Sequence, residues 1–389
     1  MKTKIAIISI YHCESSLCLA KYLAKLGCKV DYYYLAGWYH SINHSSGFEY
    51  DNASRLIGNH KLTKSECPEI YEYMEGLPVR LYIMRIFHAE MFPLLNKIIL
   101  WFLLLQIKLR KYDAINVVGQ FSRVSFIHDQ LKNENLIHTF HEIGNHDGEL
   151  KPFGIVKKVI TDKSKVILHS NNTYHRYCTI PGADIELTKT IPFGKFETYK
   201  VYQRNVNLHL PFDRNKPYFL FYGFIQSYKG LDILAESLKF LEDISDRFNV
   251  VIAGCGNDPS LDFFRRQKNC YVINRLLSND EMLQLIRDSV AILLPYKSAS
   301  QTGIIPTCTL YGKSFIATSV GAFTEMIKNK YNGLLVEPNN PQAFSNAMRE
   351  FLSDSSLRQS LSYGASQFGV NDRYDWNNIA KQTLDFYLS

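Results

Sequence analysis

The sequence predicts an α/β protein made of two parallel-sheet domains, and three observations lead to this prediction. Short runs rich in β-branched residues alternate with amphipathic stretches, and the alternation occurs twice along the chain. Strands that alternate with helices favour parallel sheets joined by right-handed crossovers. The length of 389 residues suits two or three domains of about 150 residues each. The polar stretch 193–216, with Pro211 and the following Pro217, is the expected linker.

The first series contains five predicted strands and one clearly marked helix. That helix, at 16–26, is amphipathic and is followed by Gly27, which favours a helix end. The strands are short apolar runs at 4–9, 29–34, 114–118, 136–140 and 166–169.

The second series contains six predicted strands. A helix at 231–241 follows the first of them, and Ser278 with Glu281 three residues later forms a capping box that opens another helix. The strands are expected at 218–222, 248–253, 270–273, 291–294, 314–317 and 333–336.

Composition excludes several classes of protein. With 46% hydrophobic and 21% charged residues, the chain is not a disordered, collagen-like or disulfide-rich mini-protein. Its eight cysteines include no Cys-x-x-Cys pair, which suits a reducing compartment. The apolar run 5–10 is too short for a signal peptide. We therefore expect a cytoplasmic protein.

The net charge of +7 is too small for a dedicated nucleic-acid binder. Residues 1–200 carry 25 Lys and Arg against 19 Asp and Glu, so +6 of the excess lies in the first half. Two interpretations of its densest part stay open: a solvated helix face, or a surface that meets anionic phospholipid. That part, here called the basic run, consists of Lys151, Lys157, Lys158, Lys163, Lys165 and Arg176.

The most hydrophobic stretch is 98–107, which includes Trp101. It is far shorter than the ~20 residues that a membrane-spanning helix needs. We expect a buried helix, with a helix partly dipped into a membrane as the alternative.

Several familiar cofactor motifs are missing. Thr307 stands where a phosphate loop ending in Gly312-Lys313-Ser314 would need its first glycine. The first strand is not followed by Gly-x-Gly-x-x-Gly, and the chain has no Asp-x-Asp. No cofactor and no metal are expected, so a bound diphosphate would have to rely on cations and helix N-termini.

Three loops in the second half carry residues suited to an anion. Lys229 lies in the loop after the strand 218–222, and a small, polar loop at 295–306 becomes helical. Pro306 fits only a first helical turn, so we expect the helix to start near Thr302 with free N–H groups facing a ligand. The third loop, 320–325, is also small and ends on Glu325. Ligands bind at the carboxyl ends of strands in open α/β sheets.

These segments resemble glycosyltransferase family 4, which has the GT-B fold. The resemblance covers about 130 residues and is carried by GFIQSYKGLD at 223–232, AGCG at 253–256, SVAILLPY at 289–296, SQTGII at 300–305 and IATSVG at 316–321. The first half matches more loosely, through HTFHE at 138–142, Ser170 and IPFG at 191–194. The resemblance implies two Rossmann-like α/β domains facing across a cleft.

The resemblance also implies the roles of the two domains. The N-terminal domain, 1–200, would bind the acceptor, and the C-terminal domain, 205–373, would bind a nucleotide-sugar donor. The segment 374–389, with Trp376, resembles the family's last helix, which crosses back onto the first domain.

Individual residues match the family's site. Lys229 resembles the lysine that neutralises the donor diphosphate, and His141 resembles the histidine that touches the transferred sugar. A histidine satisfied at a strand end is the alternative for His141, and His138 and His146 are weaker candidates. The implied catalytic residues are His141, Lys229 and Gln301; the donor-binding residues are Gly223, Lys229, Arg275, Leu277, Gln301, Thr302, Gly303, Thr307 and Glu325; the acceptor-binding residues are His12, Glu14 and Ser15. The loops 11–16 and 42–58 are expected to shape the acceptor site.

The chain departs from the family at two places. Many relatives carry two glutamates seven residues apart, where this chain has Ala299 or Ser300 and Thr307, so Gln301 is the polar substitute. Phe224 and Gln226 stand where relatives often have an arginine shortly before the lysine. One charge partner of the diphosphate is therefore lost.

The implied function is transfer of a sugar, with retention, from a nucleotide-diphosphate sugar to a glycan or polyprenyl-linked acceptor. The expected setting is capsule or O-antigen synthesis, with peripheral contact to an anionic membrane at its inner face and no contact with nucleic acid. Two alternatives stay open: a scaffold or binding subunit with a degenerate donor site, and a sugar-nucleotide epimerase of the same fold.

Overall fold

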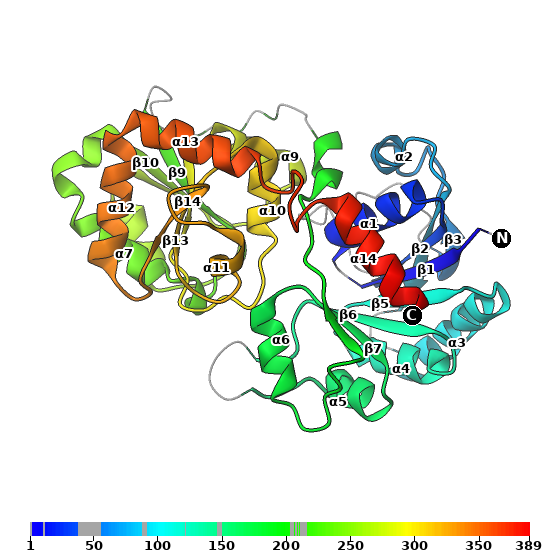
Figure 1. Ribbon diagram of the computed structural model, residues 1–389. Coiled ribbons are helices and arrows are strands. Elements are labelled where there is room, and N and C mark those ends of the chain that lie inside the picture. Colours follow the sequence, from blue (N-terminus) through cyan, green and yellow to red (C-terminus); the bar gives the residue numbers. More distant parts are fainter. Residues whose placement is uncertain are drawn as a thin grey trace. The chain divides into compact units, whose positions relative to one another are not determined.

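The computed structural model describes residues 2–10, 12–37, 56–87, 92–120, 122–145, 150–202, 206, 208, 210 and 216–389. The chain divides into two compact units, each an α/β structure (Figure 1). Unit 1 comprises Met1–Val201 and Asn371–Ser389, and unit 2 comprises Tyr202–Val370.

Unit 1 is built on an eight-stranded sheet in the order β3-β4-β2-β1-β5-β6-β7-β8. All neighbouring strands are parallel except β3 and β4, which are antiparallel. The strands are β1 (Lys4–Ser9), β2 (Lys29–Gly37), β3 (Gly58–Lys61), β4 (Val79–Ile86), β5 (Ala114–Val118), β6 (Leu136–Phe140), β7 (Lys165–Leu168) and β8 (Thr188–Thr190).

Helices cover both faces of this sheet. Figure 1 shows α3, α4 and α5 on one face and α1 with α14 on the other. The helices are α1 (Cys13–Lys25), α2 (Pro68–Met74), α3 (Pro93–Leu109), α4 (Ser122–Leu131), α5 (Gly154–Thr161), α6 (Asn171–Cys178), the 3₁₀ turn η1 (Glu197–Val201) and α14 (Trp376–Leu388).

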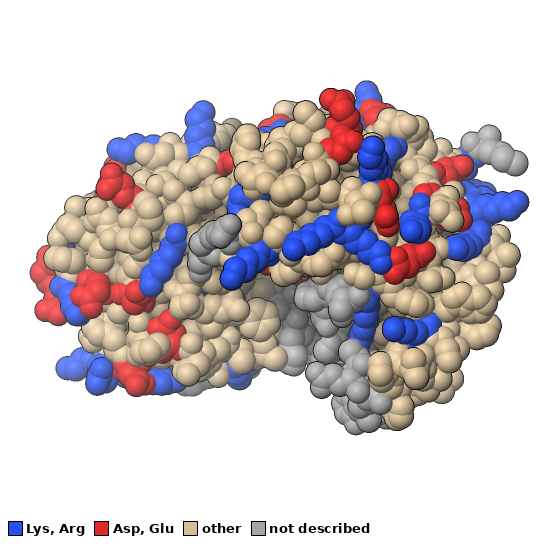
Figure 2. Space-filling view, turned by 90° about the horizontal axis from the view of Figure 1, so that it is seen from below, with Lys and Arg blue, Asp and Glu red and all other residues tan. Residues whose placement is uncertain are grey.

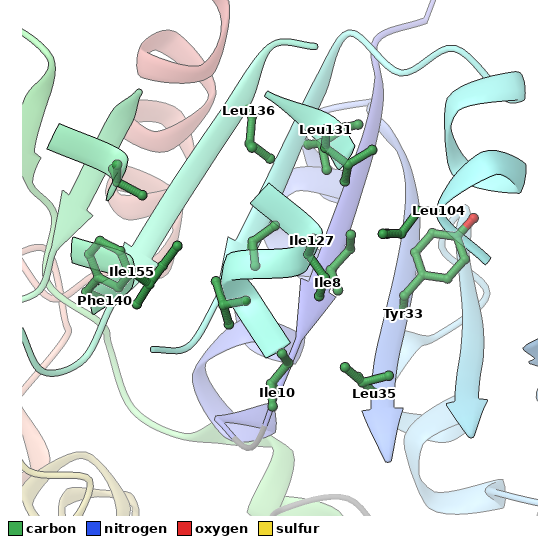
Figure 3. Packing of buried hydrophobic residues seen from close by; sticks show 14 of the residues in the cluster. Ile8, Ile10, Tyr33, Leu35, Leu104, Ile127, Leu131, Leu136, Phe140 and Ile155 are labelled. Carbon is green, nitrogen blue, oxygen red and sulfur yellow. The ribbon is translucent and has the colours of Figure 1, made fainter. Parts of the chain in front are cut away.

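The core of unit 1 forms because strand side chains alternate between two covered faces. Ile8 of β1 and Leu35 of β2 point toward the helices on one face, where Leu104, Ile127 and Ile155 join the same buried cluster (Figure 3). Burying apolar side chains of this size contributes about 1.5–3 kcal/mol each.

The C-terminal helix α14 belongs to unit 1. The Trp376 indole N–H donates to the Lys195 carbonyl oxygen at 2.7 Å, and the Trp376 ring stacks near Tyr22 of α1. Lys165 and Asn135 donate to carbonyl oxygens at the end of α14. These contacts fix the last helix against the sheet that begins the chain.

Unit 2 is built on a six-stranded parallel sheet in the order β11-β10-β9-β12-β13-β14. Its strands are β9 (Tyr218–Tyr222), β10 (Asn249–Ala253), β11 (Cys270–Ile273), β12 (Ala291–Leu294), β13 (Phe315–Thr318) and β14 (Gly333–Val336). Its helices are α7 (Leu231–Lys239), α8 (Leu261–Arg266), α9 (Asn279–Asp288), α10 (Ile304–Cys308), α11 (Phe323–Met326), α12 (Pro341–Ser353) and α13 (Ser355–Ser366), with 3₁₀ turns η2 (Ser227–Lys229), η3 (Glu242–Arg247) and η4 (Thr309–Tyr311).

The capping box opens α9 as the sequence predicts. The Ser278 hydroxyl accepts the Glu281 N–H at 3.2 Å, and the Glu281 carboxylate accepts the Ser278 N–H at 3.0 Å. Two donors that a helix start leaves without partners are thereby satisfied.

Several boundaries and elements differ from the sequence prediction. The first helix starts at Cys13, with His12 as its N-cap, rather than at residue 16. The strand expected at 29–34 runs on to Gly37, because it pairs along its whole length with β4. The sequence prediction missed β4 because two arginines and a tyrosine break up its apolar run.

The stretch 98–107 is not the buried helix that we expected. It lies within α3, where one stripe of side chains is buried and the opposite side is exposed. The helix covers the edge of one sheet face, so only one of its sides meets the core. Among the described residues, none of the helices is both long and apolar enough to cross a membrane.

Half of the basic run is engaged within the protein. Lys158 forms an ion pair with Asp129, Lys165 donates to the Phe386 carbonyl, and Arg176 donates to the carbonyl of Asn145. On the face shown in Figure 2, Lys and Arg lie among Asp and Glu. Lys151, Lys157 and Lys163 remain exposed.

Candidate functional site

Three loops of unit 2 meet at one edge of its sheet. They follow β9, β12 and β13, which are neighbours in the sheet, so their carboxyl ends lie side by side. The Lys297 N–H donates to the Tyr228 carbonyl oxygen at 2.7 Å, which joins the first loop to the second. The Ala322 N–H donates to the Ala299 carbonyl oxygen at 2.9 Å, which joins the second to the third.

A glycine allows the second and third loops to approach. Gly321 has a φ of +45°, and a Cβ there would lie 1.7 Å from the Ala299 carbonyl oxygen. A larger residue would therefore push the two loops apart. The three loops form one continuous surface at the position where open α/β sheets bind ligands.

Lys229 lies in the first loop and is almost fully buried, with 7% of its surface exposed. Its Nζ sits 5.6 Å from the centre of the Tyr296 ring and faces Gly223, where a Cβ would lie 3.0 Å away. Within the part of the chain that the structure describes, this ammonium has no carboxylate partner and no hydrogen bond from its Nζ.

Burial lowers the pKa of Lys229 from 10.5 to about 8. The charged form is disfavoured because it loses water without gaining a partner. A bound anion would restore the lost solvation, so this geometry suits a phosphate-bearing ligand.

The loop before α10 differs from the sequence prediction. The helix begins at Ile304, with Gly303 as its N-cap, rather than near Thr302. The Thr302 N–H is not free, because it donates to Gln301 Oε1 at 3.1 Å, and the Ile304 N–H donates to Thr302 Oγ1 at 3.1 Å. Polar side chains thus compete for the N–H groups that we expected to face a ligand. The N–H groups of Gln301 and Gly303 have no acceptor among the described residues.

The remaining predicted donor residues lie at the same sheet edge but with different surroundings. The Thr307 hydroxyl donates to the Gly303 carbonyl oxygen at 2.8 Å and is buried inside α10. Arg275, after β11, gives two hydrogen bonds to the Glu281 carboxylate at 2.7 and 2.9 Å. Leu277 is buried, and Glu325 lies half-buried in α11.

In unit 1, three histidines gather at the carboxyl ends of β1, β6 and β7. The His12 and His141 rings stack with centres 3.6 Å apart, and the centre of the His169 ring lies 4.6 Å from that of His141. All three Nε2 atoms are buried and have no hydrogen-bond partner among the described residues. Burial lowers the pKa of His12 to about 3 and that of His169 to about 4, and holds the pKa of His141 well below its usual range. The cluster is therefore neutral at pH 7.

The tautomer of His169 follows from its hydrogen bond. Its Nδ1 lies 2.8 Å from the Ile191 carbonyl oxygen, which can only accept. The proton is therefore on Nδ1, and Nε2 is an acceptor without a proton. The sequence prediction missed His169 as a site residue. His169 directly follows β7, as His141 directly follows β6, and the sequence prediction missed this because it included residue 169 in the strand.

The predicted acceptor residues lie in one turn of α1 beside this cluster. The Glu14 carboxylate accepts the Tyr199 hydroxyl at 3.1 Å, and burial raises its pKa to about 7. The Ser15 hydroxyl donates to the His12 carbonyl oxygen at 3.5 Å. In the two loops expected to shape the acceptor site, residues 11 and 42–55 lie outside the described residues.

The weaker histidine candidates do not join the cluster. His138 Nε2 lies 3.0 Å from His128 Nδ1, and His128 Nε2 lies 2.8 Å from the Asp162 carboxylate. His138 thus belongs to a separate buried network, and His146 lies outside the described residues. His141 and Lys229 belong to different units.

Comparisons with known proteins agree with this architecture. Residues 208–368 match the family model "Glycosyl transferases group 1". A D-inositol 3-phosphate glycosyltransferase of Xylanimonas cellulosilytica is 27% identical over 216 residues, which cover 53% of this chain and 49% of that protein. The chain spans about half the length of the curated relatives that it matches.

Solved structures share the whole fold. Sucrose-phosphate synthase from Thermosynechococcus elongatus superposes with a TM-score of 0.66 at 15% identity, over 99% of this chain and 98% of that one. The Anabaena protein HepE, in complex with UDP and glucose, superposes with a TM-score of 0.63 at 15% identity, over 99% of both chains. The predicted α/β class and two-sheet architecture are confirmed. The chain has the GT-B fold, and the matched segment supports a glycosyltransferase.

Proposed function

We propose that the protein transfers a sugar from a nucleotide-diphosphate sugar to a hydroxyl of a glycan or polyprenyl-linked acceptor. The observation that carries the proposal is Lys229, a buried ammonium without a described partner at the ligand-binding edge of the sheet. It lies in the segment that matches the glycosyl transferases group 1 model. HepE, which shares the fold, has been crystallised with UDP-glucose.

In this proposal the donor diphosphate pairs with Lys229 and accepts the N–H groups of Gln301 and Gly303. Negative charge grows on the diphosphate as the glycosidic bond breaks. Donors that are fixed in advance stabilise that charge more in the transition state than in the bound substrate. Lys229 and the backbone would supply this stabilisation without a metal, and the sugar would be transferred with retention.

The histidine cluster of unit 1 would bind sugar hydroxyls. His12, His141 and His169 are neutral at pH 7, so they can exchange hydrogen bonds with hydroxyls without adding charge. Glu14, with a pKa raised to about 7, could accept the proton of an acceptor hydroxyl near neutrality. His12, Glu14 and Ser15 would thus bind the acceptor.

We also propose a setting in surface polysaccharide synthesis, such as capsule or O-antigen, at the inner face of an anionic membrane. Support comes from the +6 charge of residues 1–200. An excess of Lys and Arg near a negatively charged surface contributes about 1 kcal/mol per residue.

The test is a panel of nucleotide sugars assayed for nucleotide release and for transfer, with calorimetry of UDP and GDP binding. We expect at least one nucleotide to bind and one donor to turn over. Lys229→Met should weaken both nucleotide binding and turnover about thirty- to hundredfold. Lys313→Met is the control, because Lys313 is half-buried and lies before β13, at the opposite edge of the sheet, where it donates to the Ser289 carbonyl oxygen at 2.7 Å.

The alternatives give different results in the same panel. A scaffold with a degenerate donor site would bind no nucleotide and turn over no donor. An epimerase would convert the sugar of the donor without transferring it. Either outcome would replace the proposal.

A further inference from the structure

Helix α3 has two apolar sides, of which the fold uses one. The side facing the core carries Asn96, Leu100, Leu103, Leu104 and Ile107, all buried. The opposite side, here called the exposed stripe, consists of the exposed Leu94, Ile98, Trp101, Phe102 and Leu109, together with the half-buried Leu105. Of these, Leu94 is 74% exposed, Ile98 53%, Trp101 44%, Phe102 54% and Leu109 73%.

The exposed stripe is continuous along the helix. At 100° per residue, its members fall within an arc about 100° wide, and they extend over about 22 Å of helix length. The rings of Trp101 and Phe102 pack edge to face, with centres 5.0 Å apart, at its middle. A surface helix normally turns polar residues outward, and a contiguous apolar patch of this kind marks an interaction site.

Charge indicates what covers the stripe. The 17 residues of α3 include no Asp or Glu, whereas Lys97 and Lys108 lie along one border of the stripe. A helix with an apolar face, an exposed tryptophan and lysines at the border is typical of the boundary between phospholipid headgroups and acyl chains. A second copy of the same face would bring lysines near lysines, with no carboxylate on the helix to pair with them. An anionic surface complements the lysines instead.

We propose that the exposed stripe of α3 inserts into the interfacial zone of an anionic phospholipid bilayer. This inference depends on the proposed function in one respect: a polyprenyl-linked acceptor would lie in the membrane that α3 enters. It assigns membrane binding mainly to an apolar helix face, which is the alternative that the sequence left open for 98–107, rather than to the basic run. Lys151, Lys157 and Lys163 would add at most a salt-sensitive attraction.

The experiment measures binding of the full chain to vesicles made of phosphatidylcholine and phosphatidylglycerol in equal parts, without nucleotide sugar. The test variant carries Ile98→Ser, Trp101→Ser and Phe102→Ser. These side chains are exposed, so the fold should be kept. The variant should bind at least about a hundredfold more weakly at both low and high salt, because three large apolar groups leave the bilayer.

The matched control removes three equally exposed apolar side chains elsewhere. Ile185, Phe240 and Tyr363 are 56%, 47% and 66% exposed, and their replacement by Ser should leave vesicle binding unchanged. A second readout uses quenching of tryptophan fluorescence by brominated lipid. Quenching should be strong in the wild type and should fall markedly in Trp101→Phe.

Three results would overturn the proposal. The first is that the test variant binds vesicles as tightly as the wild type, and the second is that quenching is unchanged in Trp101→Phe. The third is that the wild type is a dimer that does not bind vesicles, whereas the test variant is a monomer. The last result would assign the stripe to a second copy. Because binding is measured without a donor, it is independent of sugar transfer. A protein that binds vesicles through α3 but turns over no donor would refute the proposed function alone.

Discussion

Replacing Lys229 by Met should make the protein more stable and should weaken its binding of a nucleotide. The folded-state pKa of about 8 lies about 2.5 below the ordinary value of 10.5, which corresponds to a cost of about 3 kcal/mol for the buried charge. Methionine has a similar length and carries no charge, so the variant should recover part of that cost. A charge-assisted hydrogen bond to the diphosphate contributes about 2–2.7 kcal/mol, so nucleotide affinity should fall about thirty- to hundredfold.

The sign of the pH dependence gives a second measure of the same effect. Between pH 8 and 10.5 the unfolded chain holds a proton on Lys229 that the folded chain has released. Wild-type stability should therefore gain a contribution that grows as pH rises through this window, and the contribution should be missing in Lys229→Met.

The assay is urea unfolding at pH 7 and pH 9.5, together with calorimetry of UDP and GDP. Lys313→Met is again the control, since its removal deletes a hydrogen bond and should not stabilise the protein. Unfolding of Lys229→Met at lower urea than the wild type would contradict a buried, unpaired ammonium, and an unchanged nucleotide affinity would contradict its pairing with the diphosphate.

Three further predictions follow from the geometry. Gly223→Ala should destabilise the protein by about 1–2 kcal/mol in thermal unfolding, because φ is +110° and the new Cβ would lie 3.0 Å from Lys229 Nζ; an unchanged melting temperature would contradict this. His169→Phe should keep the ring packing but remove the Nε2 acceptor, lowering sugar transfer about tenfold with nucleotide affinity unchanged; equal transfer would exclude a role for His169. Acid should destabilise the fold, because the folded pKa values of His12, His138 and His169 are about 3, 3 and 4, below the unfolded 6.5. Their stability contribution is present above pH 6.5 and is lost as pH falls toward 4, with a slope of up to about 4 kcal/mol per pH unit; a flat profile in guanidinium unfolding would contradict the buried, neutral state.

The regular parts of the fold could be predicted from sequence because the pattern of apolar residues along a segment indicates which of its faces are buried. The apolar runs of β1, β9 and β12 are buried on both faces, and each stands between clear turn signals. β4 was missed because Arg80 and Arg85 interrupt its pattern. The charge of Arg80 is tolerated because of a tertiary contact: Arg80 pairs with Asp31 of the neighbouring strand β2. The residues that form such a contact lie far apart in the sequence, so a local apolar pattern does not reveal it.

The candidate site could be located from sequence but not described in detail. The position of Lys229 after a strand placed it at the binding edge, whereas its lack of a described partner is a property of the packed loops. Thr302 was misjudged because side chains of the same loop take its N–H and use its hydroxyl. The orientation of α3 depends on how much of the sheet remains to be covered, which hydrophobicity alone does not reveal.

The central claim is that Lys229 holds the diphosphate of a nucleotide-sugar donor. The most direct test measures release of nucleoside diphosphate from the best donor of the panel by the wild type, Lys229→Met and Lys313→Met. We predict turnover by the wild type and Lys313→Met, and a loss of about thirty- to hundredfold in Lys229→Met. Equal turnover by all three proteins would contradict the claim.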